Sequence, residues 1–165
     1  MAVRYSITQG DQVFAATAGA KTVLLAIAPA GHGLLVAQFS VSTDGVTASA
    51  VPAVLEMVVS TQAGAGTPAT STHAAVVTQT GGRSSGGQAP TAGCNYTAEP
   101  TVLTPIRRWF LPQFMGLLEL QFPLDREDEC DSSGGGTLGF KAIGLRINVS
   151  AAVNVIAYMQ VIAAG

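Results

Sequence analysis

The stretch Ile143-Gly144-Leu145-Arg146-Ile147-Asn148-Val149 decides the fold class, because an apolar side chain stands at every second position. Alternation of this kind places the apolar side chains on one face of an extended strand and the intervening ones on the other. The same alternation returns between Val153 and Ile162, after the small residues Ser150-Ala151-Ala152. The spacing predicts two half-buried strands joined by a short turn, a C-terminal hairpin.

The rest of the chain repeats this period of two. Apolar spacing of three and four, which an amphipathic helix needs, is not sustained over any long segment. Short strands separated by Gly, Pro and Asp indicate an all-β fold: a single antiparallel β-sandwich, jelly-roll-like, with eight or nine strands. The strands are expected at residues 13–16, 23–28, 34–41, 53–59, 74–78, 102–106, 117–122, 138–149 and 153–162.

The 165 residues suit one domain. Residues 1–17 are expected to form an N-terminal arm that becomes ordered against another subunit, and residues 18–165 to form the sandwich. Two segments are expected to be loops. One is the Gly-rich segment 81–100, and the other is 126–136, which follows and overlaps the acidic run between Asp125 and Asp131.

Charge is scarce in this chain. Hydrophobic residues make up 48% of it and charged residues 11%, against a usual ~25%, and the formal net charge is −2. This composition argues against a disordered chain, and the lack of clustered Lys and Arg argues against nucleic-acid binding. The uncharged stretches 22–43 and 147–165 are interrupted by Gly, Pro or polar residues, so no membrane span is expected. No signal peptide is recognisable at the N-terminus, which favours synthesis in a cytoplasm.

The scarcity of charge also bears on assembly. The predicted strands 34–41, 53–59 and 153–162 carry few charges or none on either face. Edge strands of a solitary sandwich usually carry charges that block pairing with another sheet. We therefore expect these strands to be covered by neighbouring subunits.

Catalytic and metal-binding motifs are incomplete. Gly82-Arg83-Ser84-Ser85-Gly86 matches the spelling of a nucleophile elbow, but its flanks are linker-like, and both histidines, His32 and His73, precede it. The acidic run lacks the alternating spacing of a calcium loop, and Cys94 and Cys130 have no metal-ligand pattern and are expected to be free thiols. The prediction is a protein that is not an enzyme and that holds no cofactor or metal.

An aromatic cluster stands out as a candidate contact region. Arg108, Trp109, Phe110 and Phe114 lie within seven residues of one another, and Met115 follows directly. One interpretation places the aromatic rings in the core or in a lid over one end of the sandwich. The other makes the cluster an anchor in a subunit or capsid contact, because Trp, Phe, Met and Arg are enriched in interfaces.

Several short motifs along the chain occur together. They are Ala18-Gly19-Ala20-Lys21-Thr22-Val23-Leu24-Leu25, Ala28-Pro29-Ala30, Ser42-Thr43-Asp44-Gly45, Thr97-Ala98-Glu99-Pro100, Gln121-Phe122-Pro123-Leu124 and Ala151-Ala152-Val153-Asn154-Val155. These motifs resemble head decoration (cement) proteins of tailed bacteriophages, which are small β-sandwich virion proteins, and the resemblance covers Ala18 to Ile162. It implies a trimeric jelly roll on the capsid exterior that binds across neighbouring major capsid proteins, after synthesis in the host cytoplasm. The long loop 63–98 and the acidic segment depart from the family pattern.

Two modes of action follow from these expectations. In the first, the protein is a homotrimer whose arm, residues 1–17, binds the major capsid protein with Tyr5, Ile7 and Phe14 as anchors. In the alternative, the same sandwich is a tail- or fibre-associated module that binds a host surface glycan, with the loop 81–100 forming the sugar site.

Overall fold

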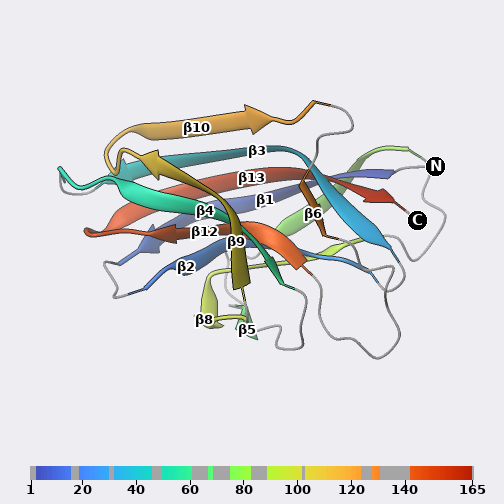
Figure 1. Ribbon diagram of the computed structural model, residues 1–165, viewed down its shortest axis with the longest axis horizontal. Helices are drawn as coiled ribbons and strands as arrows, with labels where there is room; N and C mark the ends of the chain where they lie inside the picture. The colour runs from blue at the N-terminus through green and yellow to red at the C-terminus, as the bar shows by residue number, and fades with distance from the viewer. Residues whose placement is uncertain are drawn as a thin grey trace.

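The computed structural model describes residues 3–15, 19–29, 32–45, 50–60, 67–68, 75–82, 89–101, 103–123, 128–130 and 142–164. In these ranges the chain forms strands and no helix. Two antiparallel sheets pack face to face, and a small pair of strands lies beneath the second sheet (Figure 1). The predicted all-β sandwich is confirmed.

Each large sheet has a five-strand path. The first has the order β10-β3-β13-β1-β6, with β11 pairing to the remaining length of β3, and the second has the order β7-β2-β12-β4-β9. Strands β5 and β8 form the small third sheet. The strands are β1 (Val3–Phe14), β2 (Lys21–Ile27), β3 (Gly33–Gly45), β4 (Ala53–Ser60), β5 (Thr67–Pro68), β6 (Val76–Gly81), β7 (Thr91–Cys94), β8 (Tyr96–Ala98), β9 (Leu103–Leu111), β10 (Gly116–Gln121), β11 (Asp128–Cys130), β12 (Ala142–Asn148) and β13 (Val153–Ala164).

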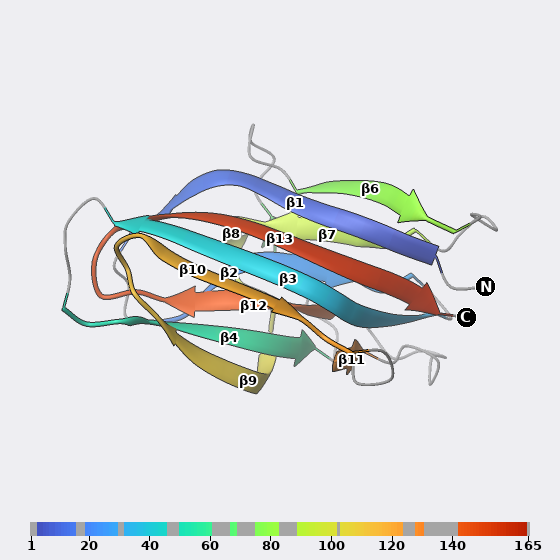
Figure 2. The same cartoon turned by 90° about the horizontal axis from the view of Figure 1, so that it is seen from above.

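The two strand orders are related by a simple rule. Read from β10 and from β9, the sheets run 10-3-13-1-6 and 9-4-12-2-7, so each strand of the first sheet has its sequence neighbour at the same position in the second. Figure 2 shows the first sheet in this order from above. The chain therefore crosses from one sheet to the other within each of these five pairs of consecutive strands, which gives the sandwich its jelly-roll-like character.

This rule corrects the predicted C-terminal hairpin. Strand β12 pairs with β2 and β4, whereas β13 pairs with β1 and β3, so the two strands lie in different sheets. Alternation of apolar residues reports that a strand has one buried face. It does not distinguish a turn within a sheet from a turn that crosses the core, and here the chain crosses at residues 149–152.

The core lies between the two sheets. Its largest fully buried side chains come from both, and the ring of Phe39 on β3 packs 5.3 Å from that of Trp109 on β9, centroid to centroid. Burial of Leu, Ile, Met or Phe stabilises the fold by about 1.5–3 kcal/mol for each side chain. Between them the sheets contribute Ile7, Leu24, Leu34, Phe39, Leu55, Met57, Ile143, Leu145, Ile147 and Met159.

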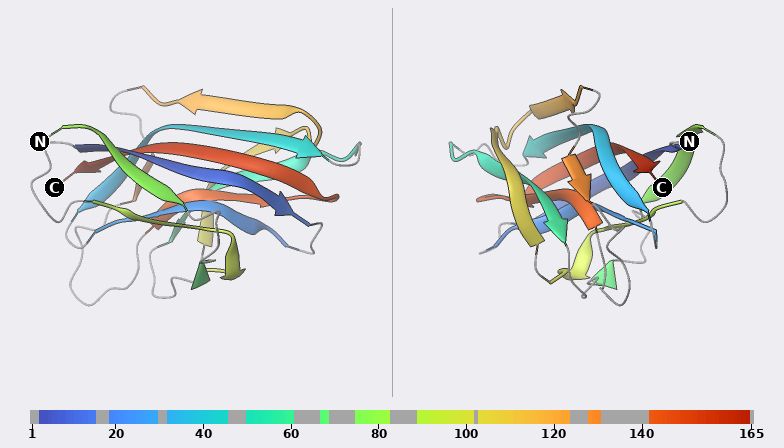
Figure 3. Two further views of the ribbon diagram at one scale, coloured as in Figure 1. Left: turned by 180° about the vertical axis from the view of Figure 1, so that it is seen from behind. Right: turned by 45° about the vertical axis from the view of Figure 1, so that its right-hand side comes forward.

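The predicted N-terminal arm is corrected by the structure. Residues 3–14 form β1, which lies inside the first sheet between β13 and β6 (Figure 3, left), and Val3 pairs with Ala163. Its inward side chains continue the period of two, so Tyr5, Ile7 and Phe14 are 3%, 0% and 5% exposed. These three residues are core residues of the sandwich, and in this fold they are not available as capsid anchors.

Two predicted loops contain strands as well. Strands β7 and β8 lie within the segment 81–100, and β11 lies within the acidic segment. β11 is held by backbone pairing to β3, with Asp128 opposite Val36 and Cys130 opposite Leu34, so residues 128–130 are not a free loop. Residues 124–127 and 131–141 fall outside the described part of the chain, as do residues 83–86 of the Gly-x-Ser-x-Gly segment.

The strands with least charge occupy protected places. β3 and β13 are interior strands of the first sheet, and β4 lies one strand inside the second, so they need no charge to protect an edge. The edge strand β9 carries its own protection. Pro105 has no backbone N–H to donate to another strand, and the pairing of β9 with β4 shifts register between Pro105 and Arg107. Arg107 and Arg108 then place two charges on the edge strand. The scarcity of charge therefore concerns the outer faces of the sheets rather than their edges.

Candidate interaction surface

The turn between β9 and β10, residues 112–115, is held in place by a buried glutamine. Gln113 is 1% exposed. Its Nε2 donates hydrogen bonds to the carbonyl of Val51 and to Ser150 Oγ, the latter at 2.7 Å, and its Oε1 accepts one from the backbone N–H of Ala151 at 3.1 Å. One side chain thus connects three loops at the same end of the sandwich.

The neighbouring residues fix the turn further. Thr43 Oγ1 on β3 donates a hydrogen bond to the carbonyl of Pro112 at 2.7 Å. A Cβ atom at Gly116 would lie 2.1 Å from that carbonyl oxygen and 2.5 Å from Thr43 Oγ1, so only glycine permits this approach. Met115 has a φ of 52°, in the left-handed region that non-glycine residues seldom occupy. The turn is a preorganised element held by the residues around it.

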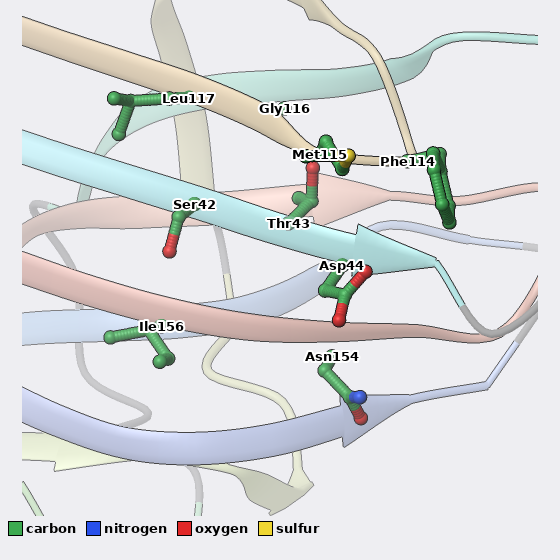
Figure 4. Close-up of a pocket in the computed structure, with 9 residues that line it drawn as sticks. All are labelled: Ser42, Thr43, Asp44, Phe114, Met115, Gly116, Leu117, Asn154 and Ile156. Carbon is green, nitrogen blue, oxygen red and sulfur yellow. The ribbon is translucent and has the colours of Figure 1, made fainter.

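The rigid turn displays apolar side chains to solvent. Phe114, Met115 and Leu117 are 51%, 78% and 69% exposed, and Ile156 on β13 is 52% exposed. With Ser42, Thr43, Asp44, Gly116 and Asn154 they line a groove of about 600 Å³, which we call the apolar groove. Figure 4 shows Phe114 and Met115 at the turn, Leu117 farther along β10, and Ile156 across β3 from it.

Strand register explains how these residues come together. Ser42 pairs with Leu117 on one side and with Ile156 on the other, so the three form a row across β10, β3 and β13. The next row contains Asp44 and Asn154, which are also paired. Because side chains alternate across a strand, both rows lie on the outer face of the first sheet. The groove is therefore built on the sheet and closed at one end by the turn.

The predicted aromatic cluster is divided by the structure. Trp109 is half-buried and faces the core, where it packs against Phe39, so the core interpretation holds for this residue. Phe114 is an exposed wall of the apolar groove. Phe110 is 78% exposed and pairs with Val54, which places it on the outer face of the second sheet, away from the groove.

Arg108 lies on that same outer face and takes part in a charge network. Its Nε is 2.6 Å from Glu56 Oε1, and Arg146 Nε donates to Glu56 Oε2. The Glu56 carboxylate is nearly buried, whereas the Arg108 side chain is 66% exposed. The pair of arginines satisfies both oxygens of a carboxylate that would otherwise be costly to bury.

Sequence reasoning missed most of the apolar groove. Leu117 and Ile156 stand at alternate positions of their strands that face solvent, because Leu118 beside Leu117, and Val155 and Ala157 on either side of Ile156, face the core. An apolar residue at a solvent-facing position of an alternating strand is the signal that the sequence contains. Ser42, Asp44 and Asn154 carry no such signal, because polar residues are ordinary on an outer face.

The described residues contain no cluster of three or more His, Cys, Asp or Glu side chains that could hold a metal ion. Cys94 is buried and forms no disulfide, and burial raises the pKa of its thiol. Within the same residues, no helix has the length and apolar character needed to cross a membrane.

Comparison with known proteins identifies no family for this chain. No family model matches the chain, and no curated protein matches it. A chain in the structure of infectious bursal disease virus Gx strain is similar, with 11% sequence identity and a TM-score of 0.25, over 98% of this chain and 42% of that chain. This chain thus spans less than half of that viral chain. A likeness at this level carries no argument about function.

Proposed function

We propose that the protein is a non-enzymatic structural component of a tailed-bacteriophage virion, which decorates and stabilises the capsid exterior as a homotrimer bound across neighbouring major capsid proteins. The resemblance of its motifs to head decoration proteins suggests this role. The observation that carries the proposal is the apolar groove, in which four exposed apolar side chains are held ready for contact by a rigid turn.

The groove is the contact between copies of this chain. Full burial of Leu, Ile, Phe or Met contributes about 1.5–3 kcal/mol, so covering four side chains that are at least half exposed contributes roughly 4–8 kcal/mol for each subunit. A cyclic trimer repeats that contact three times, because every subunit offers its groove to one neighbour and a second surface to the other. Preorganisation of the turn reduces the entropy lost on association.

The scarcity of charge on β3, β10 and β13, the strands that carry the apolar groove, also favours self-association. Strands β3, β10 and β13 contain only two charged residues, Asp44 and Glu119. Gln38 Nε2 donates a hydrogen bond to Glu119 Oε1 at 3.0 Å, which leaves the face dominated by Ser, Gln, Asn and apolar groups. Copies of such a face meet without strong like-charge repulsion.

Attachment to the capsid uses a different surface. Phe110 lies on the outer face of the second sheet beside Arg108, so it stays accessible when the groove is occupied. An exposed aromatic next to an arginine is the composition of an interface anchor. Phe110 and Arg108 thus take the place of the arm in the capsid contact.

The experiment is an electron-microscopic map of the particles with which the protein copurifies. The proposal predicts density for the sandwich in groups of three on the outer surface of the head, with Phe110 directed towards the capsid shell. Density at the tail or fibres, or single copies on the head, would contradict it.

The alternative function, a tail- or fibre-associated module that binds a host surface glycan, draws support from a different place. That place is a small polar pocket between β1, β2 and β8.

A further inference from the structure

The outer face of the first sheet carries a negative charge at one end and a positive charge at the other. Asp44 lines the apolar groove, and Arg4 on β1 lies at the opposite end, where the start of β1 is beside the end of β13 (Figure 2). Both side chains are exposed, and neither forms a hydrogen bond or an ion pair with the residues that the structure describes. Both charges are therefore open to a partner.

A second hollow surrounds Arg4, and we call it the Arg4 hollow. Its volume is about 410 Å³, and its walls come from β1, β3, β13 and the end of β10. The aliphatic part of Arg4 lies over Gly81, where a Cβ atom would be 3.8 Å from Arg4 Cβ and 3.9 Å from Arg4 Cδ. Phe122 and Pro123 give the hollow an apolar wall. The lining includes Arg4, Phe122, Pro123, Gln160 and Ile162.

The two charges of one copy are too far apart to interact with each other. Arg4 is opposite Ile162 and Asp44 is opposite Asn154, and these two partners are eight residues apart on β13. At ~3.3 Å for each residue, the separation is about 26 Å. Exposed charges in physiological salt are largely screened beyond ~8 Å. Neither charge can therefore neutralise the other within one copy.

Occupation of the apolar groove requires a cation beside Asp44. In the proposed trimer a neighbouring copy removes the groove from water, and a carboxylate that loses its water without gaining a partner strongly disfavours the contact. Figure 4 shows the Asp44 carboxylate in this groove, next to Asn154. Asn154 carries no charge, so the compensating cation has to come from the neighbour.

The cations of the described residues single out Arg4 for this role. Five Lys or Arg side chains belong to the described part of the chain, and four of them have partners within one copy. The four pairs are Lys21 with Glu99, Arg108 with Glu56, Arg146 with Glu56, and Arg107 with the ring of Phe122. Arg4 is the fifth.

The charges also decide which surfaces meet. A contact between two apolar grooves would bring two Asp44 carboxylates together, and a contact between two Arg4 hollows would bring two guanidinium groups together. A groove against a hollow joins opposite charges and places the apolar wall of Phe122 and Pro123 near the groove. Such a contact uses two different surfaces of the same chain, as a cyclic trimer requires.

We propose that the Arg4 hollow is the second surface of the trimer contact, and that Arg4 of each copy pairs with Asp44 in the apolar groove of the next copy. This inference rests on the proposed function, because it needs a groove that another copy occupies. The planar guanidinium of Arg4 has donors for both carboxylate oxygens, so the pair sets the register of the contact as well as its strength.

The test is charge exchange, followed by light scattering of the full chain over a dilution series. Arg4→Asp and Asp44→Arg each bring like charges together, so each should raise the concentration at which half of the trimer dissociates by about tenfold or more. The double variant Arg4→Asp/Asp44→Arg restores an opposite pair in every contact and should return close to the unmodified value. Arg4→Lys keeps the charge and is the matched control, which should lose less than Arg4→Asp.

A salt titration of the unmodified protein tests the pair without any variant. Raising NaCl from about 50 mM to about 500 mM should make the trimer dissociate at a higher concentration, because salt screens an ion pair at the rim of a contact. Melting temperatures of the dissociated variants should equal that of the unmodified monomer, since both positions are exposed. A trimer that is equally stable at both salt concentrations would overturn the pairing.

The outcomes separate this inference from the proposed function. If Leu117→Ser/Ile156→Ser dissociates while Arg4→Asp and Asp44→Arg remain trimeric at the same dilution, the pairing is overturned and the proposed trimer stands. A double variant that stays dissociated also overturns the pairing. If the unmodified chain is a monomer at every concentration, the proposed function fails and the pairing fails with it.

Discussion

Replacing Gln113 tests whether the turn that displays the apolar groove is held as the structure indicates. Gln113→Ala removes three hydrogen bonds from a side chain that is 1% exposed. Each contributes about 1 kcal/mol net, so the free energy of unfolding should fall by about 3 kcal/mol. For a domain of this size, that loss corresponds to a melting temperature lower by about 6–12 °C.

Urea unfolding followed by Trp109 fluorescence measures this change. Gln113→Met keeps most of the side-chain volume and loses the same hydrogen bonds, so it should be destabilised nearly as much, which separates hydrogen bonding from packing. Gln121→Ala, at an exposed position on β10, is the matched control and should change stability by less than about 0.5 kcal/mol. If both Gln113 variants lose less than about 1 kcal/mol, the turn is not held by this side chain and the reasoning fails.

Three further predictions concern other places in the fold. Gly116→Ala should lower the unfolding free energy by about 1–3 kcal/mol, because its Cβ would lie 2.1 Å from the Pro112 carbonyl oxygen, whereas Gly81→Ala, with no atom closer than 3.8 Å, should be nearly neutral in the same urea titration. Glu56→Gln should lower the unfolding free energy by about 1–2 kcal/mol, because it leaves Arg146 without a charged partner. Arg108→Ala should lower it by less than about 1 kcal/mol, because that side chain is largely exposed. Equal losses of stability in the two variants would contradict the charge network. Burial raises the pKa of Cys94 above its ordinary value of 9.0, so the folded state keeps a proton that the unfolded chain releases. Stability should therefore be full below that value and decline as the pH rises past it, and Cys94→Ala should reduce the decline in urea titrations at pH 7 and 9.5.

The sequence was sufficient for the fold class because one-sided burial imposes a period of two on each strand. The stretch from Ile143 to Val149 shows that period plainly, and it is a buried strand, β12. The pairing of strands could not be obtained in this way, since the alternation in β12 and β13 is the same whether they are neighbours in one sheet or face each other across the core. Strand β1 was mistaken for an arm although Val3, Tyr5 and Ile7 alternate, because the polar residues that follow Ile7 obscure the pattern.

The candidate site was predictable only in part. Phe114 was found because aromatic residues cluster around it in the sequence. Leu117 and Ile156 were missed because each stands beside inward-facing apolar residues, and their exposure becomes evident only when the register brings them to either side of Ser42. The polar pocket was still less accessible to prediction, since Thr22 and Glu99 are 77 residues apart in the chain.

The molecular mass in solution, measured by light scattering after gel filtration, tests the central claim most directly. The unmodified chain should have three times the 16.7 kDa mass of one copy, and the Leu117→Ser/Ile156→Ser variant should have the mass of one copy while remaining folded. Val76→Ser, an equally exposed apolar residue on β6 at the far edge of the same sheet, should leave the trimer intact. A monomeric unmodified protein, or a groove variant that still forms the trimer, would contradict the account.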